Sequence, residues 1–172
     1  MWMGFGFCET CQEAERMRKH DGKRAAIAYG LAAVAWMGVL FWFSGQSGAE
    51  SGELSSKLAL WLFDGLLKRG VDFDALHIFL RKLAHFGAFA VEGWLMGSAF
   101  LCILPKKWAA IITGIACTSA AVLNELHQTL SEGRSCEVRD MLIDTAGAML
   151  GFAFAVVVLH AFSKLQKNKH NR

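Results

Sequence analysis

AAIAYGLAAVAWMGVLFWF, residues 25–43, is a run without a charged side chain, and it decides the fold class of this chain. A hydrocarbon layer about 30 Å thick takes about 20 helical residues to cross. Three later segments are equally free of Asp, Glu, Lys and Arg: 93–104, 108–123 and 145–162. Only helices and closed barrels span lipid, and the alternating pattern of barrel strands is absent. The sequence therefore predicts an all-α polytopic membrane protein.

The apolar runs and the polar residues that flank them set the expected helix boundaries. Between the first and second membrane helices, residues 51–69 carry several leucines and Trp61 at helical spacing. This pattern is typical of an amphipathic helix lying in the membrane interface. We expect Asp72 or Asp74 to cap the helix that follows. The four predicted transmembrane helices cover about residues 25–44, 78–104, 108–130 and 140–162.

Basic residues are concentrated in the two chain ends and in one short turn. The tail 1–24, the turn with Lys106 and Lys107, and the tail 163–172 contain most of the lysines and arginines. Because cytoplasmic loops are enriched in these residues, we expect both termini in the cytoplasm, on either side of a membrane domain over 25–162. The net charge of +3 follows from this topology, so we expect no nucleic-acid partner.

The five cysteines do not have the spacing of a disulfide framework. Cys8 and Cys11 form one Cys-x-x-Cys pair in the N-terminal tail. A single pair of this kind, without a second, is a weak sign of a metal or redox site. We therefore assign no metal site and no cofactor from the sequence.

Ionisable and amide side chains interrupt the apolar helices toward one side of the membrane. Each charge inside hydrocarbon costs about 2.5–3.5 kcal/mol on insertion scales, so such residues require partners or a substrate. Lys82, His85 and Glu92 lie along one side of the second predicted helix. Glu125 and Gln128 share a face of the third through their i, i+3 spacing. Glu92 lies deepest, and we expect it to be protonated or paired inside the bundle.

The fourth predicted helix begins with acidic residues and continues with small ones. Asp140 and Asp144 lie one turn apart, and Gly147 and Gly151 continue the same stripe. Small residues four apart let a neighbouring helix approach closely, so this helix buries its acidic end and its glycines against the same partners. Arg134 follows a glycine in the turn before this helix. The predicted faces together enclose a polar pocket that opens to the outside.

Four stretches follow one another in a characteristic order over about residues 30–155. They are Ser44-Gly45-Gln46-Ser47, Arg81-Lys82-Leu83-Ala84-His85-Phe86, Glu125-x-x-Gln128 with Gly133-Arg134, and Asp140-x-x-x-Asp144-x-x-Gly147-x-x-x-Gly151. Together they resemble the VanZ-like family, which is named after a protein associated with teicoplanin resistance. The resemblance implies a bacterial cytoplasmic-membrane protein with a link to the cell envelope, and it implies no particular reaction. Phe89 stands where this family often has a hydroxyl-bearing aromatic residue, and Asp144 stands where it often has Asn.

Our leading interpretation is a site for an anionic lipid headgroup or a lipid-linked cell-envelope precursor. Arg134 offers a planar guanidinium suited to phosphate or carboxylate, and Lys82 adds a point charge, with Arg81 as a further cation. For a catalytic version of the site, His85 is the candidate general acid or base and Glu125 would orient it. The predicted substrate-binding residues are Gln46, Ser47, Lys82, Gln128, Arg134, Asp140 and Asp144.

Other classes of function remain open from the residues alone. The charged side chains could be interhelical ion pairs that only fasten the bundle, each worth about 0.6–2 kcal/mol. A hydrolase or transferase on the same lipids would use His85 and Glu125, although no activated nucleophile is visible. A metal-dependent enzyme would bind a divalent cation through these two residues together with Asp140 and Asp144. A proton-coupled transporter would depend on Glu92.

Overall fold

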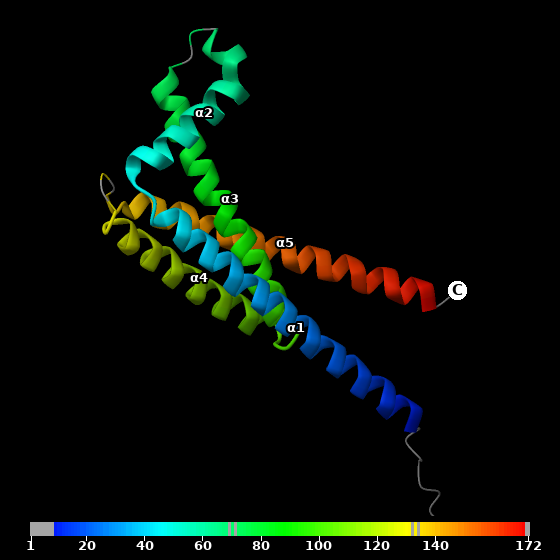
Figure 1. The fold of residues 1–172 in the computed structure, drawn as a ribbon. Helices are drawn as coiled ribbons and strands as arrows, with labels where there is room; N and C mark the ends of the chain where they lie inside the picture. Colours follow the sequence, from blue (N-terminus) through cyan, green and yellow to red (C-terminus); the bar gives the residue numbers. More distant parts are fainter. Residues whose placement is uncertain (1–8, 69, 71, 132, 134, 171–172) are drawn as a thin grey trace, which may run out of the picture.

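The computed structural model describes residues 9–68, 70, 72–131, 133 and 135–170, and throughout these residues the regular structure is helical (Figure 1). The predicted all-α class is therefore confirmed for the described part of the chain. Arg134 and Cys8, both singled out from the sequence, lie outside the described residues. In chain order the helices are α1 (Glu9–Ser44), α2 (Gly48–Leu67), α3 (Phe73–Leu101), α4 (Lys106–Gln128) and α5 (Val138–His170).

Every predicted helix is present, but several extend further than expected. α1 begins at Glu9 rather than near residue 25, and α5 continues to His170. α3 begins at Phe73 because Asp72 caps it, accepting hydrogen bonds from the backbone N–H groups of Asp74 and Ala75 at 3.3 Å. The predicted boundaries were too short at these ends because hydropathy marks only the apolar part of a helix. The backbone hydrogen-bond ladder continues through polar residues as well.

Three helical segments are long and apolar enough to cross a membrane: Asp21–Ser44, Lys106–Gln128 and Val138–Ala161. Large apolar side chains on their surfaces are exposed, including Leu31, Trp42 and Leu142. Lipid solvates such side chains, whereas water does not. α3 is not among the three segments, so the predicted count of four transmembrane helices is not confirmed.

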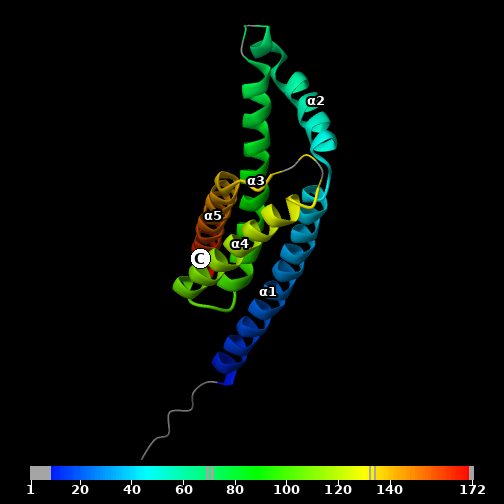
Figure 2. The ribbon, with the colours of Figure 1, turned by 90° about the vertical axis from the view of Figure 1, so that its left-hand side faces the viewer.

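α3 occupies the centre of the bundle and contacts each of the other four helices, most extensively α5 (Figures 1 and 2). Gly147 and Gly151 of α5 lie so close to the carbonyl oxygens of Phe86 and Ala90 in α3 that a Cβ on either glycine would overlap them. Gly93 makes an equally close contact from the α3 side. The predicted packing role of the α5 glycine stripe is thus confirmed, with α3 as its partner.

At one end of the bundle α1 ends, α2 and α3 meet, and α4 turns into α5; this end is termed the α2 end (Figures 1 and 2). The Oγ of Ser44 donates a hydrogen bond to the carbonyl oxygen of Asn124, and the Oγ of Ser131 donates one to the carbonyl oxygen of Gly45, both at 3.1 Å. Gly133 has a φ of 74° in the α4–α5 turn, a conformation that glycine adopts without steric cost. These contacts hold the ends of α1 and α4 together.

A small hydrophobic core joins four of the helices below the α2 end. It brings together Leu40 of α1, Phe89 of α3, Cys117 and Ala121 of α4, and Ala148 of α5. Most of these side chains are small, so the helices approach closely. The bundle therefore positions polar groups from α3, α4 and α5 on a common, tightly packed frame.

Candidate functional site

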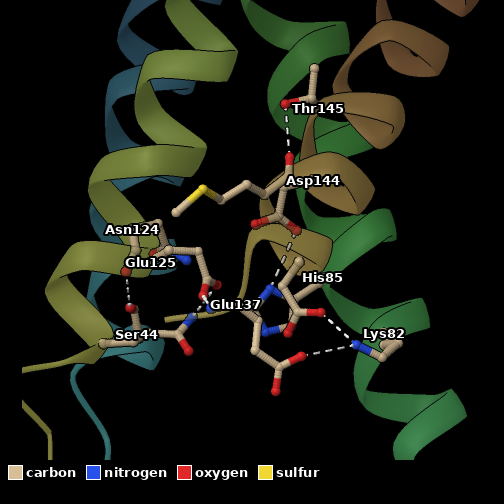
Figure 3. A network of polar contacts seen from close by, with 11 residues as sticks. Ser44, Lys82, His85, Asn124, Glu125, Glu137, Asp144 and Thr145 are labelled. Atoms are coloured by element: carbon tan, nitrogen blue, oxygen red, sulfur yellow. Dashed lines mark hydrogen bonds and ion pairs between the residues drawn. The ribbon is translucent and has the colours of Figure 1, made fainter. Parts of the chain in front are cut away.

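Polar side chains from three helices meet at the α2 end (Figure 3). The Nζ of Lys82 lies 2.5 Å from the Oδ1 of Asp140 and 3.6 Å from the Oε2 of Glu137. The Nδ1 of His85 lies 3.3 Å from the Oδ1 of Asp144. Lys82 and His85 are one turn apart on α3, and their partners are one turn apart on α5. Two parallel polar pairs therefore connect the same two helices.

Glu125 on α4 is 1% exposed, and the structure holds it at both carboxylate oxygens. The Nε2 of Gln128 donates a hydrogen bond to Oε1 at 3.1 Å, and the backbone N–H of Glu137 donates one to Oε2 at 3.0 Å. The predicted shared face of Glu125 and Gln128 is thereby confirmed, and the two side chains are hydrogen-bonded on it. The contact with Glu137 ties the beginning of α5 to the end of α4, so the carboxylate has a defined orientation.

His85, Glu125 and Asp144 converge from α3, α4 and α5 (Figure 3). One nitrogen or oxygen atom from each lies within 4.8 Å of the corresponding atoms of the other two. We expected Glu125 to orient His85, but the carboxylate that pairs with His85 is that of Asp144. The reason is the helix register, since Asp144 lies one turn below Asp140 and is therefore level with His85.

A cleft of about 310 Å³ lies beside this network, between α1 and α3. Trp36, Leu40 and Phe89 line it with apolar surface, whereas Arg81 and Gln128 line it with polar groups. A cavity of this volume is at the lower end of the range for small-molecule sites, about 300–1,000 Å³. The sequence predicted a polar pocket enclosed by faces of the second, third and fourth membrane helices, whereas this cleft is lined largely by α1 and α3 and much of its lining is apolar.

The polar and apolar linings are separated along the length of the cleft. The Nε1 of Trp36 donates a hydrogen bond to the carbonyl oxygen of Ala88 at 2.9 Å, so these two residues of α1 and α3 lie at the same height along the bundle. Ser44 lies two turns beyond Trp36, about 12 Å toward the α2 end. Arg81 lies two turns before Ala88, about 10 Å in the same direction because α1 and α3 run in opposite directions. The polar lining residues are therefore concentrated at the α2 end, where Phe43 and Leu58 also line the cleft, and the lining toward the middle of the bundle is apolar.

The structure gathers most of the predicted site residues but distributes them over two features. Lys82, His85, Glu125, Gln128, Asp140 and Asp144 make up the polar network, and Gln46 lines the cleft together with His85 and Gln128. Ser47 follows α1 in the turn to α2, next to the lining residue Gln46.

Sequence reasoning missed Glu137 and Asn124. Glu137 bonds Glu125 through its backbone and lies near Lys82, and Asn124 lines the cleft. An acidic residue directly before a helix is a recognisable start signal and marks Glu137. Asn124 directly precedes Glu125 at the end of an apolar run. This position beside a predicted site residue is the sequence signal that could have identified it.

Glu92 lies apart from the network, two turns further along α3 than His85. It is fully buried, and neither of its carboxylate oxygens accepts a hydrogen bond from the described residues. Thr113 on α4 is buried in the same way, and its hydroxyl has no partner within that part of the chain. Glu92 was expected to be either protonated or paired within the bundle. Among the described residues, no side chain pairs with its carboxyl group.

A comparison with protein-family models covers the part of the chain that contains the polar network and the cleft. A family model described as VanZ/LLP1 matches residues 29–159, which extend from the membrane part of α1 to near the end of the apolar part of α5. The match includes all the residues of the polar network and of the cleft. No curated protein and no solved structure matches the chain. The resemblance deduced from the four sequence stretches is confirmed, and the chain belongs to the VanZ/LLP1 family.

Proposed function

We propose that the protein is a multi-pass protein of the bacterial cytoplasmic membrane in which α3 is a fourth span. The central position of α3 supports this, because polar side chains on a central helix face other helices rather than lipid. Lys106 and Lys107 begin α4 at the end of the bundle opposite the α2 end, which supports a cytoplasmic location for that end and for both termini. The α2 end then faces the outer side.

α2 fits a position in the outer interface of the membrane. Its exposed apolar side chains Leu58, Trp61 and Leu62 share one face by their helical spacing, and its charged residues include Lys57 and Asp64. Trp and Leu on one surface of a helix are typical of residues that lie at the headgroup boundary. This position would cover apolar surface that water would otherwise contact.

The cleft between α1 and α3 binds an anionic lipid or a lipid-linked cell-envelope precursor. The observation that carries this proposal is the division of the cleft into a polar end and an apolar end, because an amphiphile has the same division. Its headgroup would lie at the α2 end, and an acyl chain would follow Trp36 and Leu40 toward the bundle centre. The association of this family with teicoplanin resistance supports an envelope lipid as the ligand.

Arg81 is the cation that suits this role. Its Nε is buried, and no described residue accepts a hydrogen bond from it. The side-chain oxygens of Asn124 and Gln128, which also line the cleft, receive no hydrogen bond from the described residues either. A phosphate would accept from Arg81, and headgroup hydroxyl or amine groups would donate to the two amides. Lys82 suits the role less well because Asp140 already pairs with it.

A purely structural function is the second candidate. The pairs Lys82–Asp140 and His85–Asp144 both join α3 to α5, the most extensively packed helix pair. Interhelical pairs stabilise membrane bundles by about 0.6–2 kcal/mol each. In this reading the network fastens the bundle, and the cleft holds bulk lipid without selectivity.

Native mass spectrometry of the gently solubilised protein separates the two candidates. The comparison uses wild type, Arg81→Gln and, as a matched control, Arg139→Gln, which changes an exposed arginine near the same end of the molecule. We expect wild type and Arg139→Gln to retain the same anionic lipid. Arg81→Gln should lose about ten-fold or more of that occupancy, since a charge-assisted hydrogen bond is worth about 1.5–3 kcal/mol.

Equal lipid occupancy in Arg81→Gln and wild type would contradict the proposal, as would a wild-type protein that carries no anionic lipid. Either result would favour the structural function. Circular dichroism of all three proteins shows whether the variants are folded equally, so a loss of lipid is not mistaken for a loss of structure.

A further inference from the structure

We propose that His85, Glu125 and Asp144, within the polar network beside the cleft, form a binding site for one divalent transition-metal ion. The three side chains come from three different helices and point toward one another (Figure 3). The sequence left a wider set open, with Asp140 as a fourth ligand, and the structure brings His85, Glu125 and Asp144 together.

The distances within this trio suit a common ion. Ligand atoms that bind one metal at about 2.0–2.2 Å lie about 3–4.4 Å apart, depending on the coordination angle. The Nδ1 of His85 and the Oδ1 of Asp144 are 3.3 Å apart, within this range. All three ligand atoms lie within 4.8 Å of one another, so the Glu125 carboxylate lies close to this range as well.

Asp144 provides a second and independent observation. It is fully buried, and neither of its carboxylate oxygens accepts a hydrogen bond from any described residue. Its contact with His85 has the distance of an ion pair and leaves most of its lone pairs unused. A buried carboxylate without donors is costly, and a metal ion would satisfy both oxygens.

The charges within the trio also balance around a divalent ion. Glu125 and Asp144 supply two negative charges, which a divalent cation neutralises with His85 as a neutral ligand. Without a metal, a protonated His85 would offset only one of the two. The nearest lysine, Lys82, is engaged by Asp140 and Glu137.

Glu125 is oriented as metal-binding carboxylates usually are. Its oxygens accept hydrogen bonds from Gln128 and from the backbone of Glu137, and such outer contacts hold a ligand in position. Each carboxylate oxygen has two acceptor sites, so both keep a lone pair for a metal.

One imidazole and two carboxylates indicate the class of ion. Imidazole nitrogen suits zinc, iron and copper, whereas carboxylate oxygen suits manganese and magnesium. The mixed set therefore favours Zn²⁺, Fe²⁺ or Mn²⁺ over Ca²⁺ and Mg²⁺, which prefer all-oxygen sites. Because His85 also lines the cleft, the ion would lie within reach of an anionic group bound there. The metal site stands independently of the lipid proposal, since it is tested without any added lipid.

Cobalt(II) is a suitable probe because it substitutes for these ions and absorbs visible light. The experiment uses full-length protein purified without a histidine tag, in a background with serine at Cys8, Cys11 and Cys136, so that native thiols outside the apolar helices do not compete. In this background we expect saturable binding of one Co²⁺ per chain. His85→Ala and Asp144→Asn each remove a direct ligand, so each should weaken binding by more than the roughly ten- to hundred-fold that the loss of an outer contact causes.

A thiol introduced at the site tests the geometry directly. Asp144→Cys should add a near-ultraviolet charge-transfer band, which arises when a thiolate binds Co²⁺. Thr145→Cys is the matched control, because Thr145 is the next residue on α5 and its hydroxyl is bonded to the carbonyl oxygen of Met141 instead. We expect no such band from Thr145→Cys.

Three results would overturn the metal site: no saturable Co²⁺ binding in the background protein, unchanged binding in Asp144→Asn, or the same absorption band from both cysteine variants. The spectra of folded Asp144→Cys and Thr145→Cys distinguish loss of a ligand from loss of structure, because a misfolded protein would not give one ordered Co²⁺ site.

Discussion

The two sides of α3 are built in different ways. Toward α5, glycines bring the two backbones into contact, and the pairs Lys82–Asp140 and His85–Asp144 connect the helices at the α2 end. Toward α1, Trp36 and other large side chains stand between the helices, and a cleft of about 310 Å³ lies among them. One helix thus takes part in a tight contact and a loose one.

The difference between the tight α3–α5 contact and the looser α1–α3 contact shows how a small membrane bundle can contain a cleft and still keep its helices in a fixed arrangement. Packing between small residues supplies most of the association energy between helices in lipid, since the hydrophobic effect contributes little there. The α3–α5 contact can therefore act as the frame, and the α1 side is free to accommodate a ligand. The following variants test whether the two sides are independent in this way.

The largest effect should come from the tight side. Gly151→Ala places a Cβ against the carbonyl oxygen of Ala90, so the two helices must separate, and the free energy of unfolding should fall by about 1–3 kcal/mol. Gly38→Ala is the control, because nothing lies within 4 Å of a Cβ at Gly38. This control should be neutral or stabilising by up to about 1 kcal/mol, as alanine favours helices over glycine. Thermal unfolding followed by circular dichroism measures both, and equal stability of the two variants would refute the tight contact.

An intermediate effect is expected for the ion pair between Lys82 and Asp140. A double-mutant cycle with Lys82→Met and Asp140→Leu should give a coupling energy of about 0.6–2 kcal/mol, because each single variant leaves a polar partner without its contact. The double variant should recover part of the lost stability, since two apolar side chains of similar volume replace the pair. Unfolding in denaturant measures the cycle. Strictly additive single effects would show that the pair does not stabilise the α3–α5 contact.

The smallest effect on stability should come from the loose side. Ala84 lines the cleft and is exposed, so Ala84→Phe should fill part of the cavity at a cost of less than about 1 kcal/mol. The retained anionic lipid should nevertheless decrease strongly in native mass spectra. Ala146→Phe makes the same change at an exposed position of α5 away from the cleft and should leave lipid occupancy unchanged. Equal lipid retention by the two variants would show that the cleft is not the lipid site.

Much of the fold and part of the site could be read from local patterns. Residues 25–43 predicted a helix of membrane length, and Gly147 with Gly151 predicted a packing surface. Asp72 or Asp74 was the predicted cap of α3, and the structure shows that it is Asp72. The spacing of Glu125 and Gln128 predicted their shared face. Each of these features depends on neighbours within one or two helical turns, which is why the sequence suffices for them.

Contacts between helices could not be read in this way. Glu125 was expected to orient His85, but Asp144 is its partner, and the backbone of Glu137 holds Glu125. These pairings depend on the relative height and rotation of α3, α4 and α5. The turn lengths and the close glycine contacts set both quantities together.

The sequence by itself determined the class of the protein, the approximate helices, the family and the set of polar residues to be explained. Only the tertiary structure decided which of those residues face one another and where a cleft remains. The physical reason is that hydropathy and helical periodicity act along one chain segment, whereas register and cavity shape arise from the simultaneous packing of several segments. For that reason Arg81 and Lys82, adjacent in sequence, differ in their surroundings: Lys82 is engaged by Asp140, and Arg81 lines the cleft.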